Sequence, residues 1–139
     1  MRIQKQLAGF LLLISLLLSV QGCGSNSSNP EITAIDVHNK IAANENIVLI
    51  DVRTPEEHSI DHISNDISIP LDTLNDIVNK SEIRTGDEII VYCRSGRRSS
   101  EAQLILESLG YKNVKSMSGG ITNWTSLNYV VCNGNTRTC

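Results

Sequence analysis

The segment from Glu88 to Leu109 constrains the fold of this chain more than any other. Its first part, Glu88 to Tyr92, is a short apolar, β-branched run that is typical of a buried strand. Its last part, from Ser99 onward, has the periodicity of one apolar helical face, made by Ala102, Ile105, Leu106 and Leu109. Between them, Cys93 stands at the C-terminal end of a strand and before a helix. Open α/β sheets bind their ligands at this position.

The loop between this strand and this helix reads Cys93-Arg94-Ser95-Gly96-Arg97-Arg98. Backbone N–H groups of a tight glycine-containing loop, together with a helix N-terminus, form a concave site of positive potential. A cysteine in such a site is favoured as its thiolate, the nucleophilic form. Three arginines here, in a chain of net charge −3, also predict an anionic substrate. The alternative, an inert buried thiol, is disfavoured by these cationic and polar neighbours.

The rest of residues 31–131 alternates between strand and helix signals. The apolar run from Ile47 to Ile50 is typical of a parallel strand that is covered on both faces. Asp51 and Arg53 follow it, and we interpret them as an ion pair that supports the loop rather than as catalytic groups. The pattern predicts a single α/β domain with a mainly parallel five-stranded sheet and helices on both faces.

Two helix starts are readable from capping signals. Thr33 is expected to cap a helix that runs to about Ala43, with three apolar residues facing inward, namely Ile35, Ile41 and Ala42. Thr54 is expected to cap the next helix, with Pro55 at its first position and Glu57 completing a capping box. A further helix is expected over residues 71–79, and Gly119-Gly120 is expected to open the last one.

The loop CRSGRRS after a strand resembles the active-site loop of rhodanese-domain sulfurtransferases. Residues 48–55, VLIDVRTP, continuing through His58 to Asp61-His62-Ile63, resemble the first signature of that family, and residues 109–124, LGYKNVKSMSGGITNW, resemble its closing segment. Residues 64–66, Ser-Asn-Asp, replace the usual Pro-Gly-Ala, which affects a turn rather than the site. The resemblance implies that Cys93 accepts a sulfane sulfur and carries it as a persulfide.

Three kinds of chemistry are open to Cys93. In a sulfurtransferase, its thiolate attacks an anionic donor such as thiosulfate, which is held by the loop from Arg94 to Ser99, and a thiol or cyanide then accepts the sulfur. In a sensor or docking protein, an exposed thiolate is reversibly modified without turnover. A phosphatase needs Cys-x5-Arg, but here the sixth residue after Cys93 is Ser99, so this loop is short for phosphate. We rank the sulfurtransferase first and the phosphatase last.

No cofactor, metal or nucleic-acid partner is expected, and we expect a monomer. His58 and His62 are four residues apart, a spacing that can bind metal on a helix, but one such pair is weak support for a site. By the resemblance, His62 matches a structural position at a helix end. Beyond the arginines of the loop, no basic patch predicts nucleic-acid binding.

The N-terminus predicts export and a lipid anchor. Residues 1–22 have a positive start and an apolar stretch that is too short for a comfortable membrane span. Val20-Gln21-Gly22-Cys23 resembles a bacterial lipobox, which implies cleavage before Cys23 and lipid on its sulfur. The alternative is an ordinary secretory signal peptide. Residues 23–30 then form a lipidated, flexible tether, and the domain faces the periplasm or another extracytoplasmic side of the cell envelope.

Cys132 and Cys139 remain, in the tail of residues 132–139. A disulfide is permitted outside the cytoplasm, and Asn133-Gly134 offers a turn between the two cysteines. The alternatives are two free thiols, or one thiol that resolves an oxidised Cys93. We favour the local disulfide.

Overall fold

The computed structural model describes residues 29–139. The expected leader and Cys23 lie outside the described residues, as does the expected tether apart from Asn29 and Pro30. Within the described part of the chain, no helix is both long and apolar enough to cross a membrane.

The described chain folds around one five-stranded sheet in which all strand pairs are parallel. The spatial order is β1-β5-β4-β2-β3, and the strands span Glu31–Ile32, Ile47–Asp51, Ile67–Ser68, Glu88–Tyr92 and Asn113–Met117 for β1 to β5. The strand predicted before Cys93 is therefore β4, at the centre of the sheet. The predicted α/β class, with its parallel five-stranded sheet, is confirmed.

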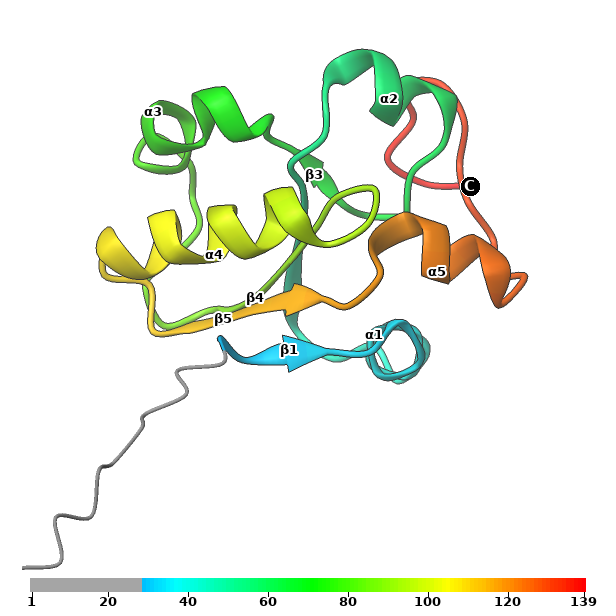
Figure 1. Cartoon of the computed structure of the whole chain (residues 1–139), viewed down its shortest axis with the longest axis horizontal. Helices are drawn as coiled ribbons and strands as arrows, with labels where there is room; N and C mark the ends of the chain where they lie inside the picture. Colours follow the sequence, from blue (N-terminus) through cyan, green and yellow to red (C-terminus); the bar gives the residue numbers. More distant parts are fainter. Residues whose placement is uncertain (1–28) are drawn as a thin grey trace, which may run out of the picture.

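Helices cover both faces of the sheet (Figure 1). They are α1 (Ala34–Ala42), α2 (Pro55–Ile60), α3 (Leu74–Val78), which follows the short 3-10 turn η1 (Leu71–Thr73), α4 (Arg97–Ser108) and α5 (Gly120–Ser126). Because side chains alternate along a strand, β4 feeds two separate cores. Ile89 and Val91 pack with α3 and α4, whereas Ile90 and Tyr92 pack with α1 and α5.

The first helix confirms its predicted cap but not its predicted buried face. The Thr33 hydroxyl accepts a hydrogen bond from the N–H of Asp36, and α1 begins at Ala34. The buried residues are Ala34 and Val37, while Ile35 is 48% exposed, so the prediction that Ile35 and Ala42 face inward is wrong. Residues 34, 37 and 41 form the apolar face of α1. A residue one position further along a helix points about 100° away from such a face.

The second helix follows its capping signals. The Thr54 side chain accepts from the N–H of Glu57, and the Glu57 carboxylate accepts in return from the N–H of Thr54. Pro55 occupies the first helical position, where its missing N–H costs nothing. The helix predicted over residues 71–79 is shorter than expected, because its first turn is the 3-10 turn η1.

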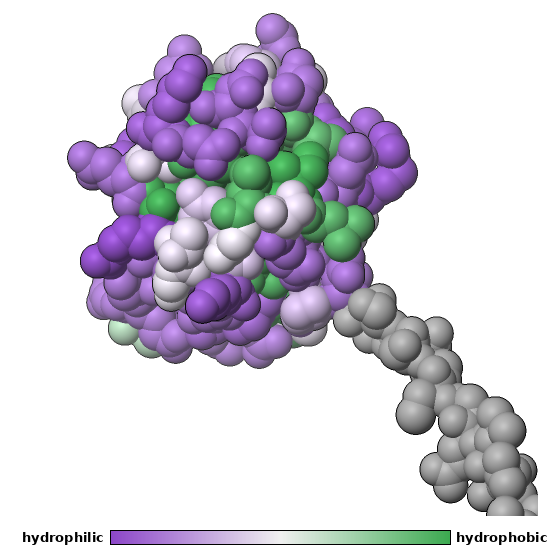
Figure 2. All heavy atoms as spheres, turned by 90° about the vertical axis from the view of Figure 1, so that its left-hand side faces the viewer, coloured by the Kyte–Doolittle hydropathy of each residue, from purple (hydrophilic) through white to green (hydrophobic). Residues whose placement is uncertain are grey.

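The face of the domain beside α3 and the C-terminal end of α4 carries a hydrophobic patch within a hydrophilic surround (Figure 2). Partly buried apolar side chains such as Ile83 and Leu109 pack against the core cluster of α3 and α4. That core is aliphatic apart from Tyr111, in keeping with an aromatic content of 4%.

The packing of α4 predicts a clear contrast between two leucines of one helix. Leu106 is fully buried, so Leu106→Ala should lower the free energy of unfolding by about 2–5 kcal/mol, through lost burial and a residual cavity. Leu104 is 53% exposed, and Leu104→Ala should change it by less than about 0.5 kcal/mol. Urea unfolding of both variants measures the difference, and equal losses would contradict the assigned orientation of α4.

Candidate active site

The loop between β4 and α4 is built around the backbone of Gly96. Gly96 has a φ of 113°, in the left-handed region that residues with a Cβ rarely adopt, and α4 begins at the next residue. Its N–H donates a hydrogen bond to the Cys93 Sγ at 3.1 Å. The predicted position of Cys93, directly after a strand and facing the N–H groups of a helix start, is thus observed.

Two opposing effects act on the Cys93 thiol. Its burial, with 1% of the residue exposed, raises the pKa, but hydrogen bonds from the backbone of Ser99, Gly96 and Ser95 and from the Ser99 side chain outweigh that effect. The net pKa of Cys93 is therefore lowered from its ordinary value. The lowered pKa favours the nucleophilic thiolate of Cys93, and the burial restricts access to it. The sensor alternative assumes an exposed thiolate instead.

Ser99 lies beneath the sulfur rather than at the loop surface. Its hydroxyl is 3.7 Å from the Cys93 Sγ, donates to the Gly96 carbonyl at 2.9 Å, and shares a hydrogen bond of 2.7 Å with the Ser116 hydroxyl. Both serines are buried. Ser99, which was predicted to contact a substrate, therefore contacts the loop, the sulfur and β5. Ser116, on β5, was not predicted because nothing near it in sequence points to Cys93.

The start of α5 holds the opposite side of the loop. The N–H of Ile121 donates to the carbonyl of Cys93 at 2.9 Å, and the N–H of Thr122 donates to that of Arg94 at 3.1 Å. Gly120, with a φ of 56°, makes this approach possible, since a Cβ there would clash with the carbonyl oxygen of Cys93 and lie 2.6 Å from the Arg94 carbonyl carbon. The predicted role of Gly120, helix initiation, is thus only part of its function.

The three loop arginines have different environments. Arg94 and Arg97 are exposed at the rim of the loop. Arg98 is partly buried and donates two hydrogen bonds to the Glu57 carboxylate, at 2.7 Å and 2.8 Å. All three arginines were predicted to contact a substrate, and Arg98 differs from the other two in having an anionic partner from α2.

Asp51 and Arg53 form the predicted ion pair. The Arg53 guanidinium donates to the Asp51 carboxylate at 2.7 Å and to that of Asp61 at 2.8 Å, and it lies over the ring of Tyr92. Burial raises the pKa of Asp51 even against the attraction of Arg53. This pair fixes α2 next to β4, and its role is structural support, as the sequence indicated.

Two open hollows border the loop. One of about 350 Å³ lies between α2 and α5 and is lined in part by Arg53, Glu57 and Arg94. The other, about 380 Å³, lies toward α4 and is lined in part by Arg53, Arg98 and Ile105. Arg53 borders both, and the Glu57–Arg98 ion pair contributes one residue to each. Each hollow thus reaches one side chain of the loop segment, Arg94 in the first and Arg98 in the second.

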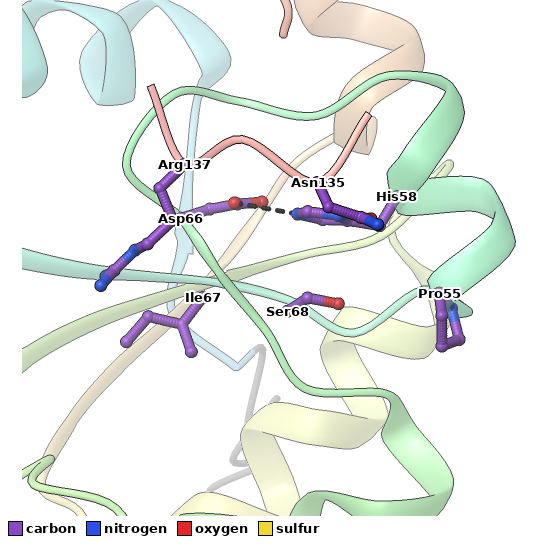
Figure 3. A pocket seen from close by; sticks show the side chains of 7 residues that line it. All are labelled: Pro55, His58, Asp66, Ile67, Ser68, Asn135 and Arg137. Carbon is purple, nitrogen blue, oxygen red and sulfur yellow. Dashed lines mark hydrogen bonds and ion pairs between the residues drawn. The ribbon is translucent and has the colours of Figure 1, made fainter. Parts of the chain in front are cut away.

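A third hollow, of about 330 Å³, lies beneath the C-terminal tail (Figure 3). In it, His58 and Asp66 point toward one another and share a hydrogen bond of 3.1 Å, while Asn135 and Arg137 lie beside them. His58, His62 and Asp66 offer ligand atoms within 4.8 Å of one another. Both ring nitrogens of His62, however, already contact carbonyl oxygens, those of His58 and Thr136. We therefore assign these side chains to structure and not to a metal.

The tail beside this hollow is closed on itself. Cys132 and Cys139 form a disulfide, while Cys93 is the free cysteine of the described residues. Cys132 also exchanges two backbone hydrogen bonds with His62. The tail is thus attached to the domain just after α2.

Comparison with known proteins gives a consistent assignment. The family model described as "Rhodanese-like domain" matches residues 33–127. A "Sulfurtransferase" of Allochromatium vinosum is 33% identical over 68% of this chain and 86% of its own length. The "Thiosulfate sulfurtransferase PspE" of Escherichia coli is 36% identical over 50% of this chain and 67% of its own length.

The "Putative sulfur carrier protein YrkF" of Bacillus subtilis is 35% identical over 71% of this chain, which spans about half of that longer protein, 52%. Among solved structures, a rhodanese-related protein of Thermoplasma volcanium superposes with a TM-score of 0.67 at 30% identity, over 75% of this chain and 98% of the other. The BH2092 protein of Bacillus halodurans superposes with a TM-score of 0.69 at the same identity, over 75% and 77% of the two chains.

The residues matched by the family model include the strand, loop and helix around Cys93 as well as the segments that carry Arg53 and Gly120. With the family model covering most of the described residues and the sheet order in place, the chain belongs to the family of rhodanese-like domains, whose members include sulfurtransferases.

Proposed function

We propose that this protein is a sulfurtransferase that carries sulfur on Cys93. The observation that supports this most directly is the hydrogen bond from the Gly96 N–H to the Cys93 Sγ at 3.1 Å, within a loop that lowers the pKa of the thiol. The same N–H groups would stabilise a negative charge on the outer sulfur of a persulfide. The relatives named as sulfurtransferases support the same reaction class.

With thiosulfate as donor, the Cys93 thiolate attacks the outer sulfur. A new S–S bond forms to Cys93, the bond to the sulfonate sulfur breaks, and its electron pair leaves with sulfite. An acceptor nucleophile, cyanide or a thiolate, then attacks the outer sulfur of the persulfide and releases the Cys93 thiolate. Charge and electrons balance in both steps, so the cycle needs no external oxidant or metal ion.

The exposed rim favours a small anionic donor. Arg94 and Arg97 present two cations to solvent beside the loop, and the hollow next to Arg94 has room for a donor or a thiol acceptor. The relatives named as sulfurtransferases favour transfer over a sensing role, in which a small solute would oxidise the buried Cys93 without turnover. Sulfur transfer from a small donor that fits the loop is the better explanation.

The proposal predicts a mass change at one residue. After incubation with thiosulfate, the protein should gain one sulfur atom that maps to the Cys93 peptide and is lost on adding cyanide or a thiol. Cys93→Ser should abolish both the gain and the transfer while leaving the fold intact. Intact and peptide mass spectrometry, with cyanide-dependent thiocyanate formation, measure the outcome. Transfer by Cys93→Ser, or a wild-type Cys93 that is free and alkylatable but gains no sulfur, would exclude the mechanism.

The position of Ser99 near the sulfur predicts that its replacement shifts the pH dependence of Cys93 alkylation. Ser99→Ala removes a hydroxyl that lies 3.7 Å from the sulfur and can turn from the Gly96 carbonyl to donate to the thiolate, so the pKa of Cys93 should rise and the thiolate should form only at higher pH. The pH profile of Cys93 alkylation by iodoacetamide should move upward while its high-pH plateau stays unchanged. Ser100→Ala is the matched control, because Ser100 donates to the Gly96 carbonyl and does not contact the sulfur. An unshifted Ser99→Ala profile would contradict the assigned role.

We propose in addition that the mature protein is attached to the cell envelope through lipid on Cys23, facing an extracytoplasmic compartment. The Cys132–Cys139 disulfide supports this location, since disulfides persist in oxidising compartments. Metabolic labelling with an alkyne fatty acid in a bacterial host should label the wild-type chain, and Cys23→Ala should lose the label and leave the membrane fraction. Equal labelling of the two would refute the anchor.

A further inference from the structure

The Glu57–Arg98 ion pair joins α2 to the first turn of α4. Both Arg98 nitrogens at the end of the side chain donate to the two Glu57 oxygens, at 2.7 Å and 2.8 Å, a bidentate arrangement. The side chains are 25% and 31% exposed, so the pair lies at the surface, at the edge of the hollows beside the Cys93 loop. Solute anions therefore have access to the same guanidinium.

Glu57 is held in this place by a second set of contacts. Its carboxylate accepts from the N–H of Thr54, and its own N–H donates to the Thr54 hydroxyl, so the start of α2 fixes the direction of the side chain. Its hydrogen bonds to Arg98 lower its pKa to about 2. Glu57 is therefore charged at every pH at which the protein would operate, and its carboxylate is a permanent neighbour of Arg98.

We propose that Glu57 is a specificity-determining residue that occupies, on Arg98, the place an oxyanion of the sulfur donor would take. This inference rests on the proposed function only because it takes the competing anion to be the sulfur donor. A carboxylate and a sulfonate present similar pairs of oxygens to a guanidinium, so they compete for the same two donors. Arg98 stands in the first turn of α4, between Gly96, whose N–H donates to the Cys93 Sγ at 3.1 Å, and Ser99, whose hydroxyl is 3.7 Å from that sulfur. A donor that displaced Glu57 would be held at the edge of the loop that contains the sulfur.

Because Glu57 pairs with Arg98, the site should bind anions less tightly than three unpaired arginines would. Arg94 and Arg97 remain available, but both are exposed, and exposed charges are screened by water and salt. Removing the charge of Glu57 should release Arg98 for anions. Glu57→Gln is well suited to this test, because glutamine also completes a capping box and should preserve α2. Glu56→Gln is the matched control, since Glu56 is an exposed neighbour with the same charge in the same helical turn.

The test compares two alkylating reagents of nearly equal size on the full chain, scored at the Cys93 peptide. Iodoacetate is an anion and iodoacetamide is neutral, and both form an S–C bond to the same thiolate and release iodide. Any change in the pKa of Cys93 therefore cancels in the ratio of their rate constants. Glu57→Gln should raise the iodoacetate-to-iodoacetamide ratio about fivefold, the size expected for one partly screened charge, and Glu56→Gln should leave it near the wild-type value.

A double variant tests whether the rise in the iodoacetate-to-iodoacetamide ratio comes from Arg98. In an Arg98→Gln background, the additional change Glu57→Gln should no longer raise the ratio, since no guanidinium is released. An unchanged ratio in Glu57→Gln, or an equal rise in the Glu56→Gln control or in the Arg98→Gln background, would overturn the proposal.

The alkylation ratio does not depend on sulfur transfer. If the wild-type protein transfers no sulfur but the ratio responds as expected, the proposed function fails and the role of Glu57 stands. If the wild-type protein does transfer sulfur, Glu57→Gln should also lower the KM for thiosulfate several-fold without raising kcat. An unchanged or higher KM would overturn the assignment of Glu57 to donor specificity.

Discussion

The arrangement of peptide groups in the Cys93 loop is the constraint on which the rest of the site depends. The loop must direct its N–H groups toward the sulfur, and its carbonyl groups then need partners elsewhere, because buried backbone groups are costly when unpaired. The N–H groups at the start of α5 supply those partners for Cys93 and Arg94. Gly96 and Gly120 make the two halves of this arrangement possible, one by its backbone angles and the other by lacking a Cβ.

A set of ion pairs then attaches α2 to this loop. Arg53 is anchored by Asp51 at the end of β2 and contacts Asp61 at the end of α2, and Glu57 in the middle of α2 contacts Arg98. The two pairs differ in burial: Asp51 and Arg53 are almost inaccessible, whereas Glu57 and Arg98 are partly open to solvent. A buried pair has no competitor and serves positioning, while an open pair can exchange partners with dissolved anions. This difference is the basis for assigning support to the first pair and donor specificity to the second.

The C-terminal segment completes the packing around α2 from the other side. His62 contacts a carbonyl oxygen of the tail through one ring nitrogen and a carbonyl oxygen of α2 through the other. The disulfide closes the part of the tail that contains this contact. Because α2 also carries Glu57, which pairs with Arg98, the tail and the Cys93 loop belong to one continuous set of contacts, although they are far apart in sequence.

Local signals in the sequence were enough to place Cys93 at the end of a buried strand, to assign the α/β class, and to cap α1 and α2. Each of these depends on interactions within a few residues: the apolar run of β4, the capping box of Thr54 and Glu57, and the glycine that precedes α4. The face of α1 was misjudged because a short helix with several apolar residues permits more than one inward direction, and packing against the sheet selects one.

The contacts of the loop side chains depend on the folded chain. Arg98 is paired with Glu57 whereas Arg94 and Arg97 are exposed, Ser99 contacts the sulfur and Ser116, and Gly120 approaches the loop backbone. The reason is distance along the chain: the Arg98–Glu57 pair joins residues 41 apart, and Ser99 and Ser116 are 17 apart. The position of Cys93 and the fold around it were predictable from sequence, since both follow from local pattern. The partner of Arg98 was not predictable in this way, because it depends on which segments the parallel sheet brings together.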